Sequence, residues 1–356
     1  MQTLFNLGTK LTADQNIKKY DSRRKNMNRL KLNFACWDYD RMRALMDGRV
    51  QVDGAELNFL NLPVEETFFR MARYREFEVA EMSLSSYCIS LSRPEKPFIA
   101  IPVYPSRFFR HSCIYVNANS SIQTPKDLIG KRIASPEYQM TAPVWIRGIL
   151  SDHYGVPVDA QPYLFGGEEE TGRIEKIKLE LPPNIKVSPI GPDQTLSQML
   201  YDGELDALYT ARCPSSFLKG DGKVVRLFND YEVVERNYYR QTGIFPIMHV
   251  VVIRRDVYEA NRWIAQSLTK AFLEAKKIAY KDLDETAALK TMLPWLTAHV
   301  EDAKKEFGPD WWSYGLEGNF NNLDTFTRYH FEQGLSSKKL EVKDLFAPEA
   351  LEAFKI

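Results

Sequence analysis

The segment YPSRFFRHS, residues 104–112, carries residue types suited to binding an anionic aromatic compound. An arginine holds a carboxylate through two parallel hydrogen bonds, and a phenylalanine ring stacks on a flat ligand. We therefore expect Arg107 and Arg110 to bind a carboxylate, with His111 beside them. The alternative is a solvated loop whose two phenylalanines cover the core.

A second histidine, His249, lies in the apolar string PIMHVVVI, residues 246–253. A histidine in such a strand is commonly a hydrogen-bonded core residue, but it is also a suitable proton donor near neutral pH. Asp38 follows the first predicted strand, where it acts either as a general base or as the cap of the next helix. From the residues alone, both alternatives stay open at each position.

Other polar residues follow the predicted strands, at the ends where ligands bind in open α/β sheets. Thr141 begins a predicted helix, whose free backbone N–H groups favour an anion, although plain capping is the alternative. The remaining candidates at strand ends are Glu81, Ser83, Ser85, Tyr138 and Arg212.

Several catalytic motifs are absent from the sequence. It contains no GxxxxGKS or GxxxxGKT phosphate loop, no GxGxxG after a strand, no GxSxG and no HExxH. The cysteines, at positions 36, 88, 113 and 213, have no ligand spacing with a histidine. The sequence therefore carries no metal signature.

The elements that position these residues alternate between strand and helix. In the first part, the patterns predict strands over 29–37, 55–63, 77–83, 97–105 and 111–117, with helices over 39–47 and 65–75. This rhythm indicates α/β layers around a largely parallel sheet.

The alternation of strands and helices then starts again after residue 117. A short helix and a strand are predicted over 124–137, a helix over 141–153, a strand over 158–167, and a helix and a strand over 193–213. Residues 168–192 read as an inserted hairpin or loop, and 246–256 as a strand leading back into the first sheet. Residues 66–83 align with 194–211 at a constant offset, so we expect two similar lobes facing one cleft.

Length and composition limit the class of protein. A chain of 356 residues with 44% apolar residues is sufficient for two domains. Lys and Arg number 47, as do Asp and Glu, so no charge excess indicates nucleic acid, and no apolar run is long enough for a membrane helix. Residues 1–27 read as a disordered extension without a signal-peptide core, which makes the cytoplasm the expected location.

Two strings in this sequence are specific enough to indicate a protein family. CWDYDR (36–41) and EMSLSSY (81–87) resemble the start of bacterial 4,5-dihydroxyphthalate decarboxylases, and the resemblance runs from about Asn28 to the C-terminus. That family is similar to the type II periplasmic solute-binding fold. The resemblance implies two Rossmann-like α/β lobes joined by two crossing strands, with lobe one formed by 28–117 plus 246–356 and lobe two by 118–245. The extension before Met27 departs from the family pattern.

The resemblance also implies a reaction, the loss of one carboxylate from 4,5-dihydroxyphthalate as CO2. The ring is the electron sink, so no organic cofactor is expected. As hypotheses from position and chemistry, Arg107, Arg110 and Arg212 hold carboxylates. His249 or His111 donates the proton, and Asp38 or Glu81 is the base.

Three other functions stay open. One is a non-catalytic binding protein for an aromatic carboxylate, since fold does not settle function. Another is a decarboxylase of a related aromatic dicarboxylate, and a third is a decarboxylase assisted by a divalent metal. The aromatic segment at Trp311 and Trp312 suggests a homo-oligomer contact.

Overall fold

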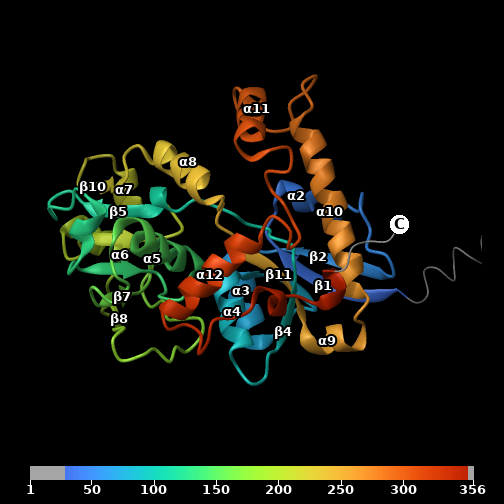
Figure 1. Cartoon of the computed structure of the whole chain (residues 1–356), viewed down its shortest axis with the longest axis horizontal. Helices are drawn as coiled ribbons and strands as arrows, with labels where there is room; N and C mark the ends of the chain where they lie inside the picture. The colour runs from blue at the N-terminus through green and yellow to red at the C-terminus, as the bar shows by residue number, and fades with distance from the viewer. Residues whose placement is uncertain (1–28, 352–356) are drawn as a thin grey trace, which may run out of the picture.

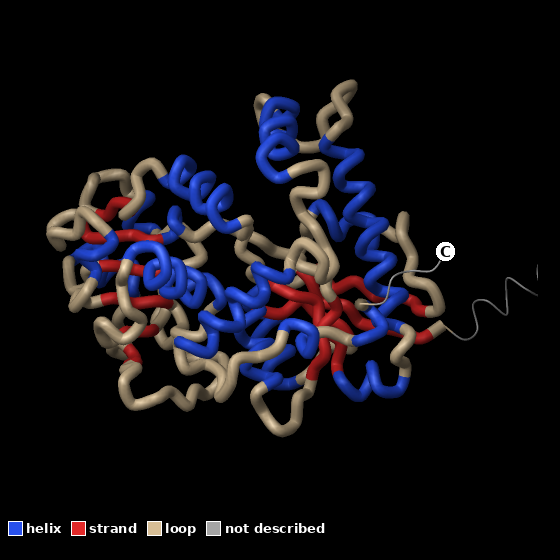
Figure 2. Tube along the Cα trace, in the orientation of Figure 1, coloured by secondary structure: helices blue, strands red, loops and turns tan. Residues whose placement is uncertain are grey.

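The computed structural model describes residues 29–351, which form two α/β lobes side by side (Figure 1). The strands gather into two separate groups, one in each lobe (Figure 2). The two-lobed α/β architecture predicted from the sequence is therefore confirmed. The extension predicted for residues 1–27 lies outside the described residues.

The sheet of lobe one has the strand order β2-β1-β3-β11-β4. Its strands are β1 (Leu30–Cys36), β2 (Ala55–Asn61), β3 (Val79–Ser83), β4 (Phe98–Ile101) and β11 (His249–Arg254). β1, β2 and β3 run parallel, whereas β11 is antiparallel to both β3 and β4. The sheet is therefore mixed, and the expected return of the chain through 246–256 is confirmed.

Helices cover both faces of this sheet because its central strands are apolar on both sides. They are α2 (Asp40–Met46), α3 (Val64–Tyr74), α4 (Leu84–Leu91), α9 (Arg255–Ala260) and α10 (Ile264–Leu283). In the core, the ring of Phe34 on β1 meets the ring of Phe272 on α10 edge to face, with centroids 5.3 Å apart.

The sheet of lobe two has the order β10-β5-β9-β6-β7-β8. Its strands are β5 (Ile114–Asn117), β6 (Ile133–Ser135), β7 (Tyr163–Phe165), β8 (Val187–Pro189), β9 (Ala207–Tyr209) and β10 (Val224–Arg226). The helices of this lobe are α5 (Thr141–Tyr154), α6 (Leu196–Asp202), α7 (Ser215–Leu218) and α8 (Tyr231–Thr242). The segment 168–192, expected as a hairpin or loop, ends in β8, which pairs with β7. Pro189 is tolerated there because β8 is an edge strand.

Two segments cross between the lobes, one from β4 to β5 and one from α8 to β11. They pair with each other, since the Met248 N–H donates to the Ser106 carbonyl at 2.8 Å and the Phe108 N–H donates to the Pro246 carbonyl at 3.1 Å. The strands expected over 97–105 and 111–117 are shorter than predicted, because the chain between them follows this crossing.

The C-terminal part adds α11 (Leu296–Phe307), which lies with the end of α10 away from the lobes, and α12 (Phe320–Glu332), which lies between them (Figure 1). α12 contacts lobe two through Tyr329, whose hydroxyl donates to Asp152 at 2.7 Å, and lobe one through His330, whose Nε2 lies 3.2 Å from the Ser85 carbonyl. Thus α12 bridges the lobes.

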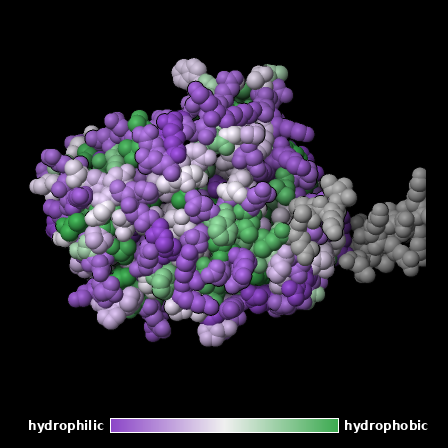
Figure 3. All heavy atoms as spheres, in the orientation of Figure 1, coloured by the Kyte–Doolittle hydropathy of each residue, from purple (hydrophilic) through white to green (hydrophobic). Residues whose placement is uncertain are grey.

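The aromatic segment at Trp311 and Trp312 packs on its own chain. The ring of Trp311 packs at a tilt against that of Tyr280 with centroids 4.4 Å apart, and the Trp312 indole N–H donates to the Tyr104 carbonyl at 2.9 Å. One face of the molecule is mostly hydrophilic, with a group of apolar residues near its middle (Figure 3). Within the described residues, no helix combines the length and the apolar character needed to cross a bilayer.

Candidate active site

A cavity of about 290 Å³ lies between the lobes and takes its walls from both. Its lining comes from the ends of β1 and β3, the crossing segments, the start of α5 and the loop before β8. We call it the interlobe cavity, and its polar lining residues are Tyr39, Glu65, Ser83, Ser106, Arg110, Thr141, Arg173, Lys176, Arg212 and His249. A cavity at the carboxyl ends of the strands is the usual place for a ligand in open α/β sheets.

His249 and Glu81 form a hydrogen-bonded pair at the wall of this cavity. In the register of β3 and β11, His249 lies opposite Ser83 and Val251 lies opposite Glu81, so His249 and Glu81 are diagonal neighbours on one face. The imidazole Nδ1 lies 2.6 Å from Glu81 Oε1. A carboxylate only accepts hydrogen bonds, so Nδ1 is the donor and Nε2 is left for the cavity.

Glu81 is fully buried and accepts further hydrogen bonds from the turn after β1. The Tyr39 hydroxyl donates to Oε1 at 2.7 Å, and the Trp37 backbone N–H donates to Oε2 at 3.2 Å. Burial by itself raises the pKa of Glu81, but the charge and hydrogen bond of His249, together with these donors, hold the pKa below its ordinary value. Glu81 is therefore a buried anion.

Two side chains that donate to Glu81, those of Tyr39 and Cys36, stay neutral. Burial, reinforced by the nearby Glu81 charge, raises the pKa of the Tyr39 hydroxyl and of the Cys36 thiol. Because both groups keep their protons, the negative charge of this cluster stays on Glu81.

Aromatic side chains form the flat walls of the cavity. The ring of Phe68 meets the His249 ring edge to face with centroids 4.9 Å apart, and Trp37, Tyr39 and Phe108 add further surface. A cavity of this volume with aromatic walls suits a single substituted ring.

The start of α5 contributes backbone N–H groups and joins the lobes. Thr141 is the first residue of α5, and its hydroxyl lies 2.8 Å from the Ser83 hydroxyl and accepts from the Ser85 N–H at 3.1 Å. The Thr141 side chain thus cross-links lobe one to lobe two, and it does not cap the helix. The positive end of the α5 dipole faces the cavity, where an anion is favoured.

Arg110 is a buried cation whose protein partners are sulfur atoms. Its Nε lies 3.1 Å from Met248 Sδ and its Nη1 lies 3.5 Å from Cys113 Sγ. Within residues 29–351, no carboxylate lies within 4.0 Å of its guanidinium. A buried guanidinium without a carboxylate partner is ready to bind one from a ligand.

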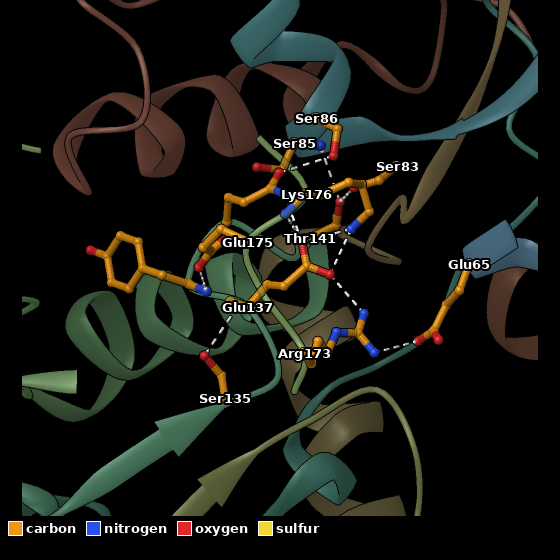
Figure 4. A network of polar contacts seen from close by, with 12 residues as sticks. Glu65, Ser83, Ser85, Ser86, Ser135, Glu137, Thr141, Arg173, Glu175 and Lys176 are labelled. Carbon is orange, nitrogen blue, oxygen red and sulfur yellow. Dashed lines mark hydrogen bonds and ion pairs between the residues drawn. The ribbon is translucent and has the colours of Figure 1, made fainter. Parts of the chain in front are cut away.

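Two cations at the cavity were missed by the sequence reasoning, Arg173 and Lys176. Both come from the charged loop before β8, where no periodic pattern predicts a position. Arg173 bridges the lobes, because its two terminal nitrogens lie 3.1 Å from Glu65 of lobe one and 2.6 Å from Glu137 of lobe two (Figure 4). Arg212, which was expected here, lies 3.6 Å from Glu65 and is more exposed. The only sequence signal was the concentration of charge in this loop.

The structure does not bring Arg107 and His111 to the cavity. The Arg107 guanidinium donates to the carbonyls of Phe245 and Ser313, at 3.0 and 2.8 Å, and to the Asn319 side chain, so it joins a crossing segment to the C-terminal part. His111 is buried among aromatic rings of lobe two, and both of its ring nitrogens lack a partner within the described residues. Burial lowers the pKa of His111 to about 4. The expectation that these two residues face a ligand is therefore corrected.

Three other expected residues also lie off the cavity wall. Asp38 pairs with Arg43 at 2.9 Å on the surface. Tyr138 is fully buried, and its hydroxyl donates to the Gln333 carbonyl at 3.2 Å, behind α5. Ser85 is buried in the first turn of α4, and its N–H donates to the Thr141 hydroxyl. Each follows its strand, but the turn after the strand points the side chain elsewhere.

No three His, Cys, Asp or Glu side chains of the described residues lie together in a way that could hold a metal ion. The cysteines at positions 36, 88, 113 and 213 are all free thiols.

Similar proteins were found in two comparisons, while no family model matches the chain. In solved structures, the chain resembles a periplasmic sulfonate-binding protein of Methylobacillus flagellatus, with a TM-score of 0.52 and 14% identity over 91% of this chain and 93% of the other. It also resembles the periplasmic aliphatic sulphonate binding protein of Escherichia coli, with a TM-score of 0.51 and 12% identity over 91% and 99%. These likenesses show the fold alone, the periplasmic-binding-protein fold predicted from the sequence.

The relatives found by sequence have a higher identity to this chain than these solved structures do. The 4,5-dihydroxyphthalate decarboxylase of Comamonas testosteroni is 41% identical over 330 residues, which are 93% of this chain and 100% of the relative. That of Pseudomonas putida is 44% identical over 214 residues, 60% of this chain and 83% of the relative. The first match extends over most of this chain and the whole of the relative, and the chain therefore belongs to the 4,5-dihydroxyphthalate decarboxylase family.

Proposed function

We propose that this protein converts 4,5-dihydroxyphthalate to 3,4-dihydroxybenzoate and CO2 in the interlobe cavity. Each ring carboxylate lies para to a hydroxyl. When that hydroxyl loses its proton, electron density builds up on the para carbon, which accepts a proton from a general acid. The bond from this carbon to the carboxylate then breaks, CO2 leaves, and its electron pair restores the aromatic ring. One proton is consumed for each CO2 released.

The proton donor in this proposal is His249. Glu81 accepts the Nδ1–H and holds the ring, so that the protonated imidazole presents Nε2–H to the carbon that bears the leaving carboxylate. General acid catalysis of this kind contributes about 10² to 10⁴ in rate. The proposal rests above all on this buried pair, which opens on a cavity sized for one ring.

The carboxylates of the substrate lie at the inner end of the cavity in this proposal. Arg110 and the N–H groups at the start of α5 bind them, while Phe68 and Trp37 contact the ring.

The base for the phenolic proton is Glu65, the carboxylate on the cavity wall. Glu65 lies one turn of α3 before Phe68, whose ring contacts His249, so a ring between Glu65 and His249 has its hydroxyl and its carboxylate at opposite ends. Arg173 and Arg212 lie beside Glu65 and stabilise the phenolate. Glu65 takes the place of Asp38, which lies off the cavity.

The experiment is turnover of 4,5-dihydroxyphthalate by the purified protein, followed as CO2 and 3,4-dihydroxybenzoate. We expect His249→Gln and Glu81→Gln to lower kcat at least about 100-fold, with KM changed little. His299→Gln, at an exposed histidine, is the matched control and is expected to keep full activity. Tight binding without CO2 release by the unaltered protein would instead support a binding protein for an aromatic carboxylate.

We propose that no organic cofactor takes part, because the ring itself accepts the electron pair. Dialysis against a chelator tests the metal-assisted alternative, in which activity is lost and returns with a divalent ion. We also propose a cytoplasmic location, supported by the four free thiols.

A further inference from the structure

One lysine from the loop before β8 is held at the cavity wall by a buried carboxylate. The Lys176 side chain is 4% exposed, and its Nζ lies 2.7 Å from each carboxylate oxygen of Glu137. The Lys176 backbone N–H donates to the same carboxylate at 3.2 Å. An ammonium group has three N–H donors, so the two contacts with Glu137 leave one for a ligand.

Glu137 is fixed by several elements at once. It follows β6, is fully buried, and accepts hydrogen bonds from the Gln139 side chain at 2.8 Å and from Arg173 at 2.6 Å (Figure 4). Burial raises the pKa of Glu137, but the charges and hydrogen bonds of Lys176 and Arg173 outweigh burial and keep the pKa below its ordinary value. The ionised Glu137 therefore fixes the position of the Lys176 ammonium group, although the loop that carries Lys176 has no regular structure.

The charges of the cavity match a dianion. The cations on its wall are Arg110, Arg173, Lys176 and Arg212, and the carboxylates paired with them are Glu65 and Glu137. Four cations against two carboxylates leave two positive charges. Lys176 and Arg110 are the two cations that Glu65 does not pair with.

Building on the proposed function, we propose that Lys176 determines specificity for an aromatic ring with two vicinal carboxylates, and that Glu137 is its positioning residue. The substrate carries two negative charges and neutralises the cavity. The product carries one carboxylate and so contacts only one of the two cations, Arg110 and Lys176. The cavity therefore binds the product more weakly than the substrate, which favours product release.

Binding of unreactive ligands by the full chain tests this inference. Phthalate and benzoate lack the para hydroxyl that the reaction needs, so calorimetry measures their affinity without turnover. We expect the unaltered protein to bind phthalate at least about tenfold more tightly than benzoate. Lys176→Met is expected to reduce this ratio about tenfold through weaker phthalate binding, with benzoate affected little.

Lys178→Met is the matched control, because Lys178 lies in the same loop with an exposed side chain outside the interlobe cavity. It is expected to keep the ratio of the unaltered protein. An unchanged ratio in a folded Lys176→Met variant would overturn the inference. If that variant does not fold, equal affinities of the unaltered protein for phthalate and benzoate would overturn it equally well.

A kinetic measurement adds a second readout. Lys176→Met should raise KM for 4,5-dihydroxyphthalate about tenfold while kcat changes less, and the inhibition constant of 3,4-dihydroxybenzoate should move towards KM. If the unaltered protein prefers phthalate, Lys176→Met lowers that preference, and the unaltered protein releases no CO2 from 4,5-dihydroxyphthalate, the proposed function fails and the role of Lys176 in binding stands.

Discussion

Glu81 illustrates how a single buried carboxylate orients a histidine ring. Three donors from β1 and the turn after it converge on the Glu81 carboxylate, and His249 is the fourth. With so many donors fixing the carboxylate, the imidazole ring is fixed as well, and only its Nε2 is available to a ligand. A residue that supports a catalytic side chain in this way commonly matters nearly as much as the side chain itself.

Glu175 leads to a prediction about pH and stability. Its carboxylate accepts from the Tyr138 N–H at 2.5 Å, while burial and the nearby Glu137 charge raise the pKa of Glu175 to about 7 from an ordinary 4.5. The folded protein thus holds this proton more tightly than the unfolded chain does. The stabilisation is full below about pH 4.5 and is lost as the pH rises through about 7.

We therefore expect Glu175→Gln to raise the free energy of unfolding by about 3 kcal/mol at pH 8 and to change it little at pH 4. Urea unfolding at the two pH values measures both numbers. The exposed Glu170→Gln is the control and should show no such difference. Equal effects of Glu175→Gln at the two pH values would contradict the prediction.

Part of the candidate site could be predicted from residue positions. Placing polar residues at strand ends found Glu81, Ser83, Thr141, Arg212 and His249, all of which lie at the cavity or support it. Arg107 and His111 differ from Arg110 only by how the crossing segment turns, which depends on pairing with 246–248. Lys176 could not be found, because its position depends on a buried carboxylate 39 residues earlier.

At the scale of elements, the contact between α5 and α12 depends on a residue without a side chain. Gly148 lies in the middle of α5, and a Cβ built there would lie 2.1 Å from the ring of Tyr329 on α12. The close approach lets Tyr329 and Trp145 pack together, with ring centroids 5.7 Å apart. Gly148 therefore sets how closely the bridging helix approaches lobe two.

Gly148→Ala should consequently lower the free energy of unfolding by about 1 to 3 kcal/mol, although alanine is the better helix former. Chemical unfolding measures this loss. Ser151→Ala, one turn further along α5, is the control and should be close to neutral. Adding Tyr329→Ala to Gly148→Ala should make the glycine change less costly. If Gly148→Ala stabilises the protein, the described packing is wrong.

Regular elements were the easiest part of the fold to predict, because apolar periodicity reports burial directly. The repeat of 66–83 in 194–211 corresponds to α3 with β3 and to α6 with β9, a helix followed by a buried strand in each lobe. β8 and the crossing segments were harder. Their conformation follows from pairing with distant strands, for which a short polar stretch carries no local signal.

At the scale of the whole molecule, Arg107 and Arg110 have different roles although they are three residues apart. Arg107 joins a crossing segment to the C-terminal part, and its burial lowers its pKa to about 10. Lysine cannot reproduce several hydrogen bonds in a fixed plane. We expect Arg107→Lys to lower Tm by several degrees, about 2 to 4 °C per kcal/mol lost, with KM nearly unchanged.

Arg110→Lys is the matched variant and should show the reverse pattern. Its KM should rise about tenfold, since lysine offers a carboxylate only a point charge, while Tm changes little. Thermal unfolding and steady-state kinetics of both variants measure the two effects. If Arg107→Lys raises KM without changing Tm, Arg107 binds the ligand, and its described position is contradicted.

The two lobes supply different parts of the candidate chemistry. His249, Glu81 and Glu65 belong to the first lobe and Arg110 to a crossing segment, whereas the other three cavity cations, Arg173, Lys176 and Arg212, belong to the second lobe. A chimera that keeps the first lobe and the crossing segments and takes the second lobe from a relative would exchange these three cations, while its acid, its base and Arg110 remained as they were. In this architecture, exchange of lobe two during evolution can change which anion is bound and leave the acid and the base of the reaction unchanged.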